Sequence, residues 1–203
     1  MAPFDVILFD IGGVLLTNGW DKGERAAVLR QFGLDQEEFE ARHLVPYRAW
    51  ERGAITVETY LDETVFYEPR TFTRRQFFAA ICEGSKLLPD GAMGILGEIV
   101  ASDRYVVGAL NNEARETNAF RFERFGLLDL FQVALSSCFL GLRKPDPEIY
   151  DRALEILCRP AERVLLIDDR QENVMAAEAA GMHALRFESA GGLRQALESI
   201  NVL

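Results

Sequence analysis

Val6-Ile7-Leu8-Phe9-Asp10-Ile11-Gly12-Gly13 is the stretch that decides the fold of this chain. Its four consecutive apolar residues are typical of a strand that is buried on both faces of a parallel sheet. Asp10 ends the run and a glycine turn follows, at the edge where such a sheet opens to its ligand. The glycines let a substrate approach the backbone closely. The stretch therefore predicts a nucleophile or metal ligand at Asp10, with a helix cap or a solvated loop acid as the alternative.

Further apolar, β-rich runs repeat the pattern and alternate with helical periodicity. The expected strands are Val6–Phe9, Tyr105–Leu110, Phe131–Leu135, Val164–Ile167 and, more weakly, His183–Phe187. The expected helices between them are Gly94–Ala101, Glu113–Phe125, Pro147–Leu157 and Glu172–Gly181. Apolar strands that alternate with helices predict an α/β fold, a Rossmann-like parallel sheet core with helices on both faces.

About 90 residues separate the first two expected strands, far more than one crossover helix needs. They contain helical patterns and no convincing strand: Arg25–Phe32, Gln36–Tyr47, Val57–Phe66 and Arg74–Ile81. The pattern predicts an inserted helical cap beside the carboxyl edge of the sheet. We expect residues 1–16 and 88–203 to form the α/β core and residues 17–87 to form the cap.

Composition excludes several classes of function. The net charge of −10, from 32 acidic and 22 basic residues, repels nucleic acid and requires a local positive site for any phosphate substrate. No apolar run approaches the roughly 20 residues that span a bilayer, and the N-terminus lacks the features of a signal peptide. Three cysteines without short spacing and two histidines without a partner argue against disulfides and zinc. We expect a cytoplasmic protein, a monomer or weak homo-oligomer, that binds neither membrane nor nucleic acid.

Two later motifs add chemistry. Arg143-Lys144-Pro145-Asp146-Pro147 presents Lys144 from a loop that the prolines stiffen, which favours a role in neutralising an anion. Ile167-Asp168-Asp169 ends a buried strand with two adjacent carboxylates, which repel each other unless a positive charge compensates. Mg²⁺ is the natural compensator, because it is a hard cation that prefers carboxylate, phosphate and water oxygens.

With these motifs in this order, the chain resembles the haloacid dehalogenase (HAD) superfamily. More narrowly, it resembles the branch of the soluble epoxide hydrolase N-terminal phosphatase and of α-D-glucose-1-phosphate phosphatase. The resemblance covers essentially the whole chain and includes Glu51-Arg52-Gly53-Ala54-Ile55-Thr56 in the insert. Its most specific parts are the segments around Lys144 and around Asp168-Asp169.

The resemblance implies a covalent mechanism and a metal site. Asp10 would attack phosphorus and form an aspartyl-phosphate that water then hydrolyses. Mg²⁺ would be held by Asp10, the backbone carbonyl of Gly12 and Asp169, with Asp168 assisting. Lys144 would pair with the nucleophile and the transferring phosphoryl group.

The resemblance also implies roles for several polar residues around this centre. Asn173 would orient the carboxylates on the metal side or a water molecule. Gly12, Asn111, Asn112 and Arg52 are the candidate substrate-binding residues. Trp20, Tyr47, Arg48 and Trp50 in the insert are candidates for contacts with the leaving group, or alternatively pack in the cap's own core.

Two positions depart from the family pattern. The usual general acid, two residues after the nucleophile, is replaced by Gly12, and such an acid is typically worth roughly 10²–10⁴ in rate. The usual hydroxyl that binds the phosphoryl oxygen is replaced by Asn111, whose amide can still donate a hydrogen bond.

Three functions fit these residues. The first is an Mg²⁺-dependent phosphatase that hydrolyses a small phosphorylated metabolite, a sugar phosphate. The second is a 2-haloacid dehalogenase with an aspartate nucleophile, which needs no general acid but leaves Asp168-Asp169 unexplained. The third is a catalytically weakened HAD scaffold that binds or regulates.

Overall fold

A computed structural model describes residues 4–203 and contains one parallel sheet of five strands. The strands are β1 (Val6–Phe9), β2 (Val106–Ala109), β3 (Val133–Ala134), β4 (Val164–Asp168) and β5 (His183–Arg186). Their order in the sheet is β3-β2-β1-β4-β5, and every neighbouring pair is parallel. The α/β fold with a Rossmann-like parallel sheet, predicted from the apolar runs, is confirmed.

Alternating side chains of β1 face two separate apolar layers, because successive residues of a strand point to opposite faces. Ile7 and Phe9 pack in a cluster with residues of α5, α6 and α10, whereas Val6 and Leu8 pack in a cluster with residues of α8 and α9. These helices are α5 (Met93–Ala101), α6 (Arg115–Arg124), α8 (Pro147–Leu157), α9 (Gln171–Ala179) and α10 (Ala190–Ser199). Short helical turns complete the described chain at α7 (Ser137–Leu140), η1 (Leu127–Asp129) and η2 (Ala161–Arg163).

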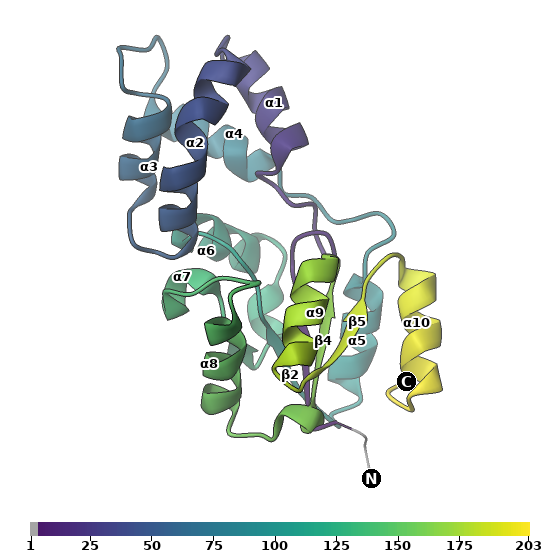
Figure 1. Cartoon of the computed structure of the whole chain (residues 1–203). Helices are drawn as coiled ribbons and strands as arrows, with labels where there is room; N and C mark the ends of the chain where they lie inside the picture. Colours follow the sequence, from purple (N-terminus) through teal and green to yellow (C-terminus); the bar gives the residue numbers. More distant parts are fainter. Residues whose placement is uncertain (1–3) are drawn as a thin grey trace.

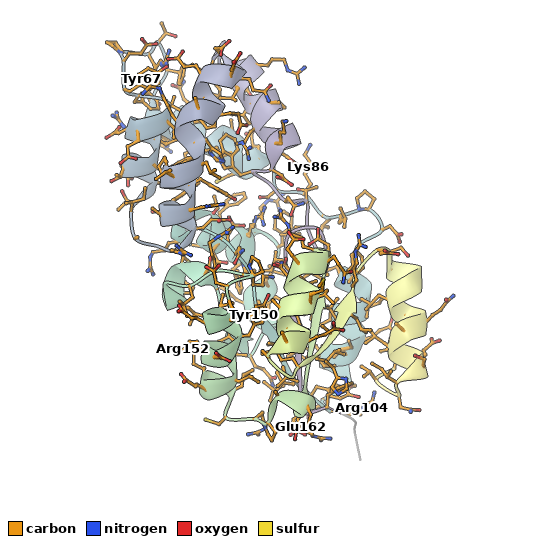
Figure 2. All side chains as sticks on the ribbon, viewed as in Figure 1. Tyr67, Lys86, Arg104, Tyr150, Arg152 and Glu162 are labelled. Carbon is orange, nitrogen blue, oxygen red and sulfur yellow. The ribbon has the colours of Figure 1, made fainter. Side chains whose placement is uncertain are left out.

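Four of the five helices between β1 and β2 gather beyond the carboxyl ends of the strands (Figure 1). They are α1 (Lys22–Gln31), α2 (Gln36–Glu51), α3 (Val57–Thr64) and α4 (Arg74–Glu83). Their aromatic side chains Phe39, Trp50, Tyr60 and Phe77 form an apolar cluster together with Trp20, which lies just before α1. We call α1 to α4 the helical unit. Figure 2 places Tyr67 at its far end and Tyr150 below it, in the α/β part.

The sheet order places a topological switch beside β1. The chain runs from β1 outward to β2 and β3, then returns to form β4 on the opposite side of β1. Crossovers therefore leave β1 and β4 in opposite directions, which opens a crevice outside the carboxyl ends of these strands. Asp10 directly follows β1 and its backbone N–H donates to the Ile167 carbonyl of β4 over 2.8 Å. Asp10 and Asp168 consequently meet at one edge.

Across residues 4–203, the helices are all too short or too polar to cross a membrane.

Candidate active site

Asp10 is held at the bottom of the crevice with one oxygen fixed by the backbone. The residue is 8% exposed, and its Oδ1 accepts a hydrogen bond of 2.7 Å from the Ile11 N–H. The other oxygen, Oδ2, lies 3.1 Å from Lys144 Nζ. Burial raises the pKa of Asp10, Lys144 opposes that rise, and Asp168 and Asp169 add to it. The carboxylate is thus presented with a defined orientation in a site that needs more positive charge.

Lys144 joins the two strand ends. It is 1% exposed, and its Nζ lies 2.5 Å from Asp168 Oδ2. Its backbone is fixed as well, because Asn112 Nδ2 donates to the Lys144 carbonyl and the Lys144 N–H donates to Asn112 Oδ1, both over 2.8 Å. Burial disfavours the charged ammonium, but Asp10 and Asp168 outweigh it, so the pKa of Lys144 lies above its ordinary value. A charged lysine therefore stands beside Asp10.

Asp168 is fully engaged by hydrogen bonds from its surroundings. Its Oδ1 accepts from the Arg170 N–H and from Asn173 Nδ2, each over 2.9 Å. Its Oδ2 accepts from Lys144 and, over 3.1 Å, from Asn173. Asn173 is held in turn, because the buried Tyr150 hydroxyl donates to its carbonyl over 3.0 Å. Asp168 thus orients Lys144, and Asn173 orients Asp168.

Asp169 differs from its neighbour because its carboxylate is left short of donors. Its Oδ1 is a buried oxygen without a hydrogen-bond partner among the described residues. Burial and the neighbouring Asp168 raise the pKa of Asp169, while Arg170 and Lys144 oppose the rise. Carboxylate oxygens of Asp10, Asp168 and Asp169 lie within 4.8 Å of one another. An orphaned oxygen in a cluster of three carboxylates with one lysine fits a hard divalent cation such as Mg²⁺.

Gly13 makes this cluster possible. Its φ of +75° favours glycine, and a Cβ added there would lie 2.2 Å from Asp169 Oδ2. The Asp169 carboxylate therefore packs directly against the backbone of the turn that follows Asp10.

A cavity of about 290 Å³ lies above these carboxylates, between the sheet edge and the helical unit. Asp10, Gly12, Asn112, Lys144 and Asn173 line it from the α/β part. Charged side chains dominate the rest of the wall: Arg25, Arg48, Arg121, Arg143, Arg170, Asp21, Glu51, Glu113 and Glu172. A small polar molecule suits such a wall better than an apolar one.

The helical unit closes the cavity through the end of α2. Glu51 is buried and accepts hydrogen bonds from Arg143, with Nη2 3.0 Å and Nε 3.2 Å from Oε2. Burial raises the pKa of Glu51, and Arg143 and Tyr47 oppose this. The Ser137 hydroxyl donates to the Glu51 carbonyl over 2.6 Å, and Trp50 Nε1 donates to Glu116 over 2.8 Å. These contacts hold the helical unit against the α/β part.

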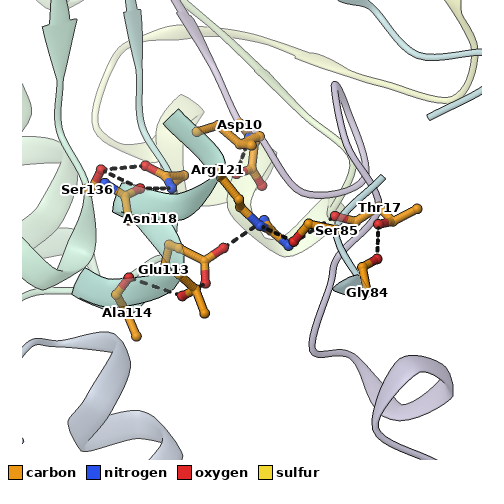
Figure 3. Close-up of polar contacts among 12 residues, drawn as sticks. Asp10, Thr17, Gly84, Ser85, Glu113, Ala114, Asn118, Arg121 and Ser136 are labelled. Atoms are coloured by element: carbon orange, nitrogen blue, oxygen red, sulfur yellow. Dashed lines mark hydrogen bonds and ion pairs between the residues drawn. The ribbon is translucent and has the colours of Figure 1, made fainter. Parts of the chain in front are cut away.

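The structure places two of the expected substrate-binding residues away from the cavity wall. Asn111 is buried in a polar network in which its Nδ2 donates to Asn118 over 3.0 Å and its Oδ1 accepts from the Ser136 hydroxyl over 2.8 Å. Figure 3 labels Asn118 and Ser136 of this network. Arg52 is exposed and pairs with Asp146 over 2.6 Å. The amide of Asn111 is therefore occupied by hydrogen bonds within the fold. Arg52 forms an ion pair between the helical unit and the loop that contains Lys144.

Of the other residues expected to contact substrate, some line the cavity and some pack in the apolar cluster of the helical unit. Tyr47 and Arg48 line the cavity, whereas Trp20 and Trp50 pack in the helical unit. Asn112 lines the cavity, although both ends of its amide hold the Lys144 backbone.

Several cavity residues were missed by the sequence analysis. Asn18, Glu113 and Arg121 are not part of any strand-end motif, and Glu51 drew attention only as part of a family motif. The sequence signal for Glu113 and Arg121 is their spacing of about two turns within the expected helix Glu113–Phe125, but α6 begins only at Arg115, so Glu113 reaches the cavity from the loop before the helix. That signal is weak without the structure.

Comparisons with known proteins identify the family and the fold. The profile of a family described as haloacid dehalogenase-like hydrolase matches residues 4–181. Flavin mononucleotide hydrolase 1 of Arabidopsis thaliana is 27% identical over 97% of this chain and 78% of its own. A phosphatase of Mycobacterium tuberculosis is 27% identical over 93% of this chain and 89% of its own. A HAD family enzyme of Bacteroides thetaiotaomicron, crystallised with magnesium and inorganic phosphate, superimposes with a TM-score of 0.77 at 21% identity, covering 92% and 95% of the two chains.

Proposed function

Since this chain belongs to the haloacid dehalogenase-like hydrolase family, and is thus a hydrolase, we propose that it is a magnesium-dependent phosphatase of a small sugar phosphate. One observation carries the proposal. Asp10 stands beside a buried Lys144, and its carboxylate clusters within 4.8 Å with that of Asp169, which has one orphaned oxygen. A nucleophile, a fixed cation and an incomplete cation site together are what phosphoryl transfer to an aspartate requires.

The residues would divide the work as follows. Oδ2 of Asp10, the oxygen that faces Lys144, attacks phosphorus, the bond to the leaving-group oxygen breaks, and water then hydrolyses the aspartyl-phosphate. Lys144 donates to the transferring phosphoryl group while Asp168 and Asn173 hold it in place. Asp10, the Gly12 carbonyl and Asp169 would hold Mg²⁺, with Asp168 assisting through its position. When bound, Mg²⁺ supplies charge neutralisation at the phosphoryl oxygens.

The cavity wall supports a polyhydroxylated leaving group. A volume of about 290 Å³ suits a small ligand, and the wall offers guanidinium, carboxylate and amide groups with Tyr47 as its aromatic residue. Hydroxyl groups of a sugar donate to and accept from such a wall, whereas a flat isoalloxazine or nucleobase finds little apolar surface to stack on. Residues 17–87 act as the cap that supplies part of this wall.

Hydrolysis of para-nitrophenyl phosphate with and without Mg²⁺ tests the reaction. We expect activity that a chelator removes and Mg²⁺ restores. A panel of sugar phosphates, flavin mononucleotide and pyrimidine nucleotides then tests the substrate class, with the highest kcat/KM expected among the sugar phosphates. Halide release from a 2-haloacid without Mg²⁺, or no turnover of any ester, would overturn the proposal.

A further inference from the structure

Gly12 leaves space beside the nucleophile that other side chains fill. A Cβ built at position 12 would lie 2.7 Å from Asn18 Oδ1 and 3.7 Å from Arg121 Nη1. Asn18 and Arg121 line the same cavity as Asp10. An amide and a guanidinium therefore stand where an acidic side chain at position 12 would begin, next to the reacting carboxylate.

Arg121 is fixed in this position from three sides (Figure 3). It is 3% exposed, its Nε donates to the Ser85 hydroxyl over 3.0 Å, and its Nη2 donates to the Thr17 carbonyl over 3.2 Å. Its Nη1 lies 2.7 Å from Glu113 Oε2. The backbone makes room for it, because a Cβ at Gly19 would meet Arg121 Nη2 at 2.1 Å. A buried cation is thus held rigidly with little freedom to lose on binding.

The guanidinium retains donors for a ligand. An arginine carries five N–H donors, and the contacts of Arg121 within the described chain use three of them. One N–H on each terminal nitrogen is left, and Arg121 lines the cavity. Glu113 balances part of the charge of Arg121. The Glu113 carboxylate also accepts a hydrogen bond from the Thr117 hydroxyl over 2.5 Å. Arg121 can therefore bind an oxygen with developing negative charge.

We propose that Arg121 is a catalytic residue, whose guanidinium stabilises the negative charge on the leaving-group oxygen in place of proton donation from position 12. This inference rests on the proposed phosphatase function. As the bond from Asp10 Oδ2 to phosphorus forms, the bond from phosphorus to the leaving oxygen breaks and its electron pair moves to that oxygen. Arg121 donates to the oxygen without losing a proton, and a solvent water protonates the alkoxide, leaving hydroxide. Charge stabilisation of this kind is typically worth roughly 10²–10³ in rate per donor.

Arg121→Gln measured on a series of phosphate monoesters provides the test. The series runs from aryl esters, whose leaving groups have low pKa values, to alkyl and sugar esters, whose leaving groups have high ones. Because a poor leaving group carries more negative charge at the transition state, we expect kcat/KM to fall roughly 10²-fold or more for alkyl esters. For activated aryl esters we expect a loss at least tenfold smaller. Addition of guanidinium chloride to Arg121→Ala is expected to restore alkyl ester hydrolysis in part.

Arg124→Gln is the matched control, because Arg124 is exposed on the same helix and lies outside the cavity wall. It is expected to retain wild-type kcat/KM for every ester. Melting temperatures of all variants separate catalysis from folding. If Arg121→Gln does not fold, Arg121→Lys keeps the charge but loses the planar donors, and the same selective loss for alkyl esters is expected of it.

An equal loss for all esters would overturn the inference, because it would mean that Arg121 only supports the two chain segments at Thr17 and Ser85. A selective loss for alkyl esters in Glu51→Gln with none in Arg121→Gln would also overturn it and assign the proton donor to Glu51. Failure of the wild-type enzyme to hydrolyse any phosphate ester would instead refute the proposed function itself, so the two failures are distinguishable.

Discussion

Lys144 Nζ lies 2.5 Å from Asp168 Oδ2, and both side chains are buried. The pair connects the loop that precedes α8 to the last residue of β4. Because Asp10 lies 3.1 Å from the same ammonium group, one lysine partly balances two carboxylates of the proposed active site. The stability of the site and its chemistry therefore depend on the same residue.

Lys144→Met removes this charge at nearly constant length. Removing one partner of a buried ion pair leaves uncompensated charge and typically costs about 3–5 kcal/mol. We expect a loss of stability in that range and at least a roughly 10²-fold loss of kcat. Urea unfolding and ester hydrolysis measure the two effects. Lys22→Met, at an exposed lysine, is the control and is expected to change neither. Unchanged stability of Lys144→Met would contradict the role of the ion pair.

Asp10→Asn is expected to abolish hydrolysis while the fold remains. The amide keeps the volume, and its oxygen still accepts from the Ile11 N–H, but it is not a nucleophile. Turnover measured with para-nitrophenyl phosphate, together with the circular dichroism spectrum, tests this. Asp151→Asn, at an exposed aspartate of α8, serves as the control and is expected to remain active. More than a few per cent of wild-type turnover in Asp10→Asn would refute a covalent mechanism.

Gly13→Ala tests the proposed metal site through its backbone. The wild-type melting temperature is expected to rise on addition of Mg²⁺, because the ion binds only the folded state. An alanine Cβ at position 13 would displace the Asp169 carboxylate, so this rise is expected to disappear.

Gly33→Ala is the control for the backbone cost alone. Gly33 has a φ of +66°, close to the +75° of Gly13, and no atom within 4 Å of an added Cβ. Both variants are expected to lose about 1–2 kcal/mol of stability from the left-handed conformation. Only Gly33→Ala is expected to keep the response of the melting temperature to Mg²⁺. A full response in Gly13→Ala would contradict the role of Asp169.

Gly12→Asp alone is not expected to restore general acid catalysis. The new Cβ would lie 2.7 Å from Asn18 Oδ1, so the amide must move before the carboxyl group finds room. Gly12→Asp combined with Asn18→Gly removes this obstacle. We expect the double variant to hydrolyse alkyl esters faster, relative to aryl esters, than either single variant. Equal ester preferences in the single and double variants would contradict the steric account.

His43 is expected to make the stability of the helical unit sensitive to acid. Trp20 Nε1 donates to the Tyr60 hydroxyl over 2.8 Å, and the same hydroxyl forms a hydrogen bond of 2.8 Å with His43 Nδ1. Burial, with a smaller effect of Arg25, lowers the pKa of His43 to about 3. The unfolded chain binds this proton near pH 6.5, so stability is expected to fall as pH decreases from 6.5 towards 3.

At most, one such histidine increases the equilibrium constant of unfolding roughly tenfold for each pH unit by which the pH is lowered. Urea unfolding between pH 7 and pH 5.5, above the range where most carboxylates titrate, measures it. His43→Gln is expected to flatten the dependence, and His183→Gln, at an exposed histidine, is expected to leave it unchanged. An equally steep dependence in His43→Gln would contradict this account.

The strands were predictable because their apolar runs are continuous. Sheet order cannot be seen in the sequence, yet all five expected runs become strands, and Val6–Phe9 does so without any change of bounds. Helix α10 was missed because its first turn contains Gly191 and Gly192, poor helix formers that Ser189 compensates by capping. Helix α2 continues beyond the expected end at Tyr47 to Glu51, which brings Glu51 to the cavity.

The sequence by itself determined where reactive groups lie along the chain. Asp10 and Asp168-Asp169 follow buried parallel strands, and such strand ends meet at one edge because all the strands run the same way. Lys144 was recognisable because prolines fix the loop that presents it.

Only the tertiary structure decided what surrounds those groups. Asn111 turns into a buried network with Asn118 and Ser136, whereas Arg121 reaches the cavity from α6 and is held by Ser85, Thr17 and Glu113. These orientations result from competition among many hydrogen-bond partners distant in sequence, and each buried polar group takes the partner that packing brings within reach. A strand end sets the place of a residue, but the complete set of its neighbours sets the direction of its side chain.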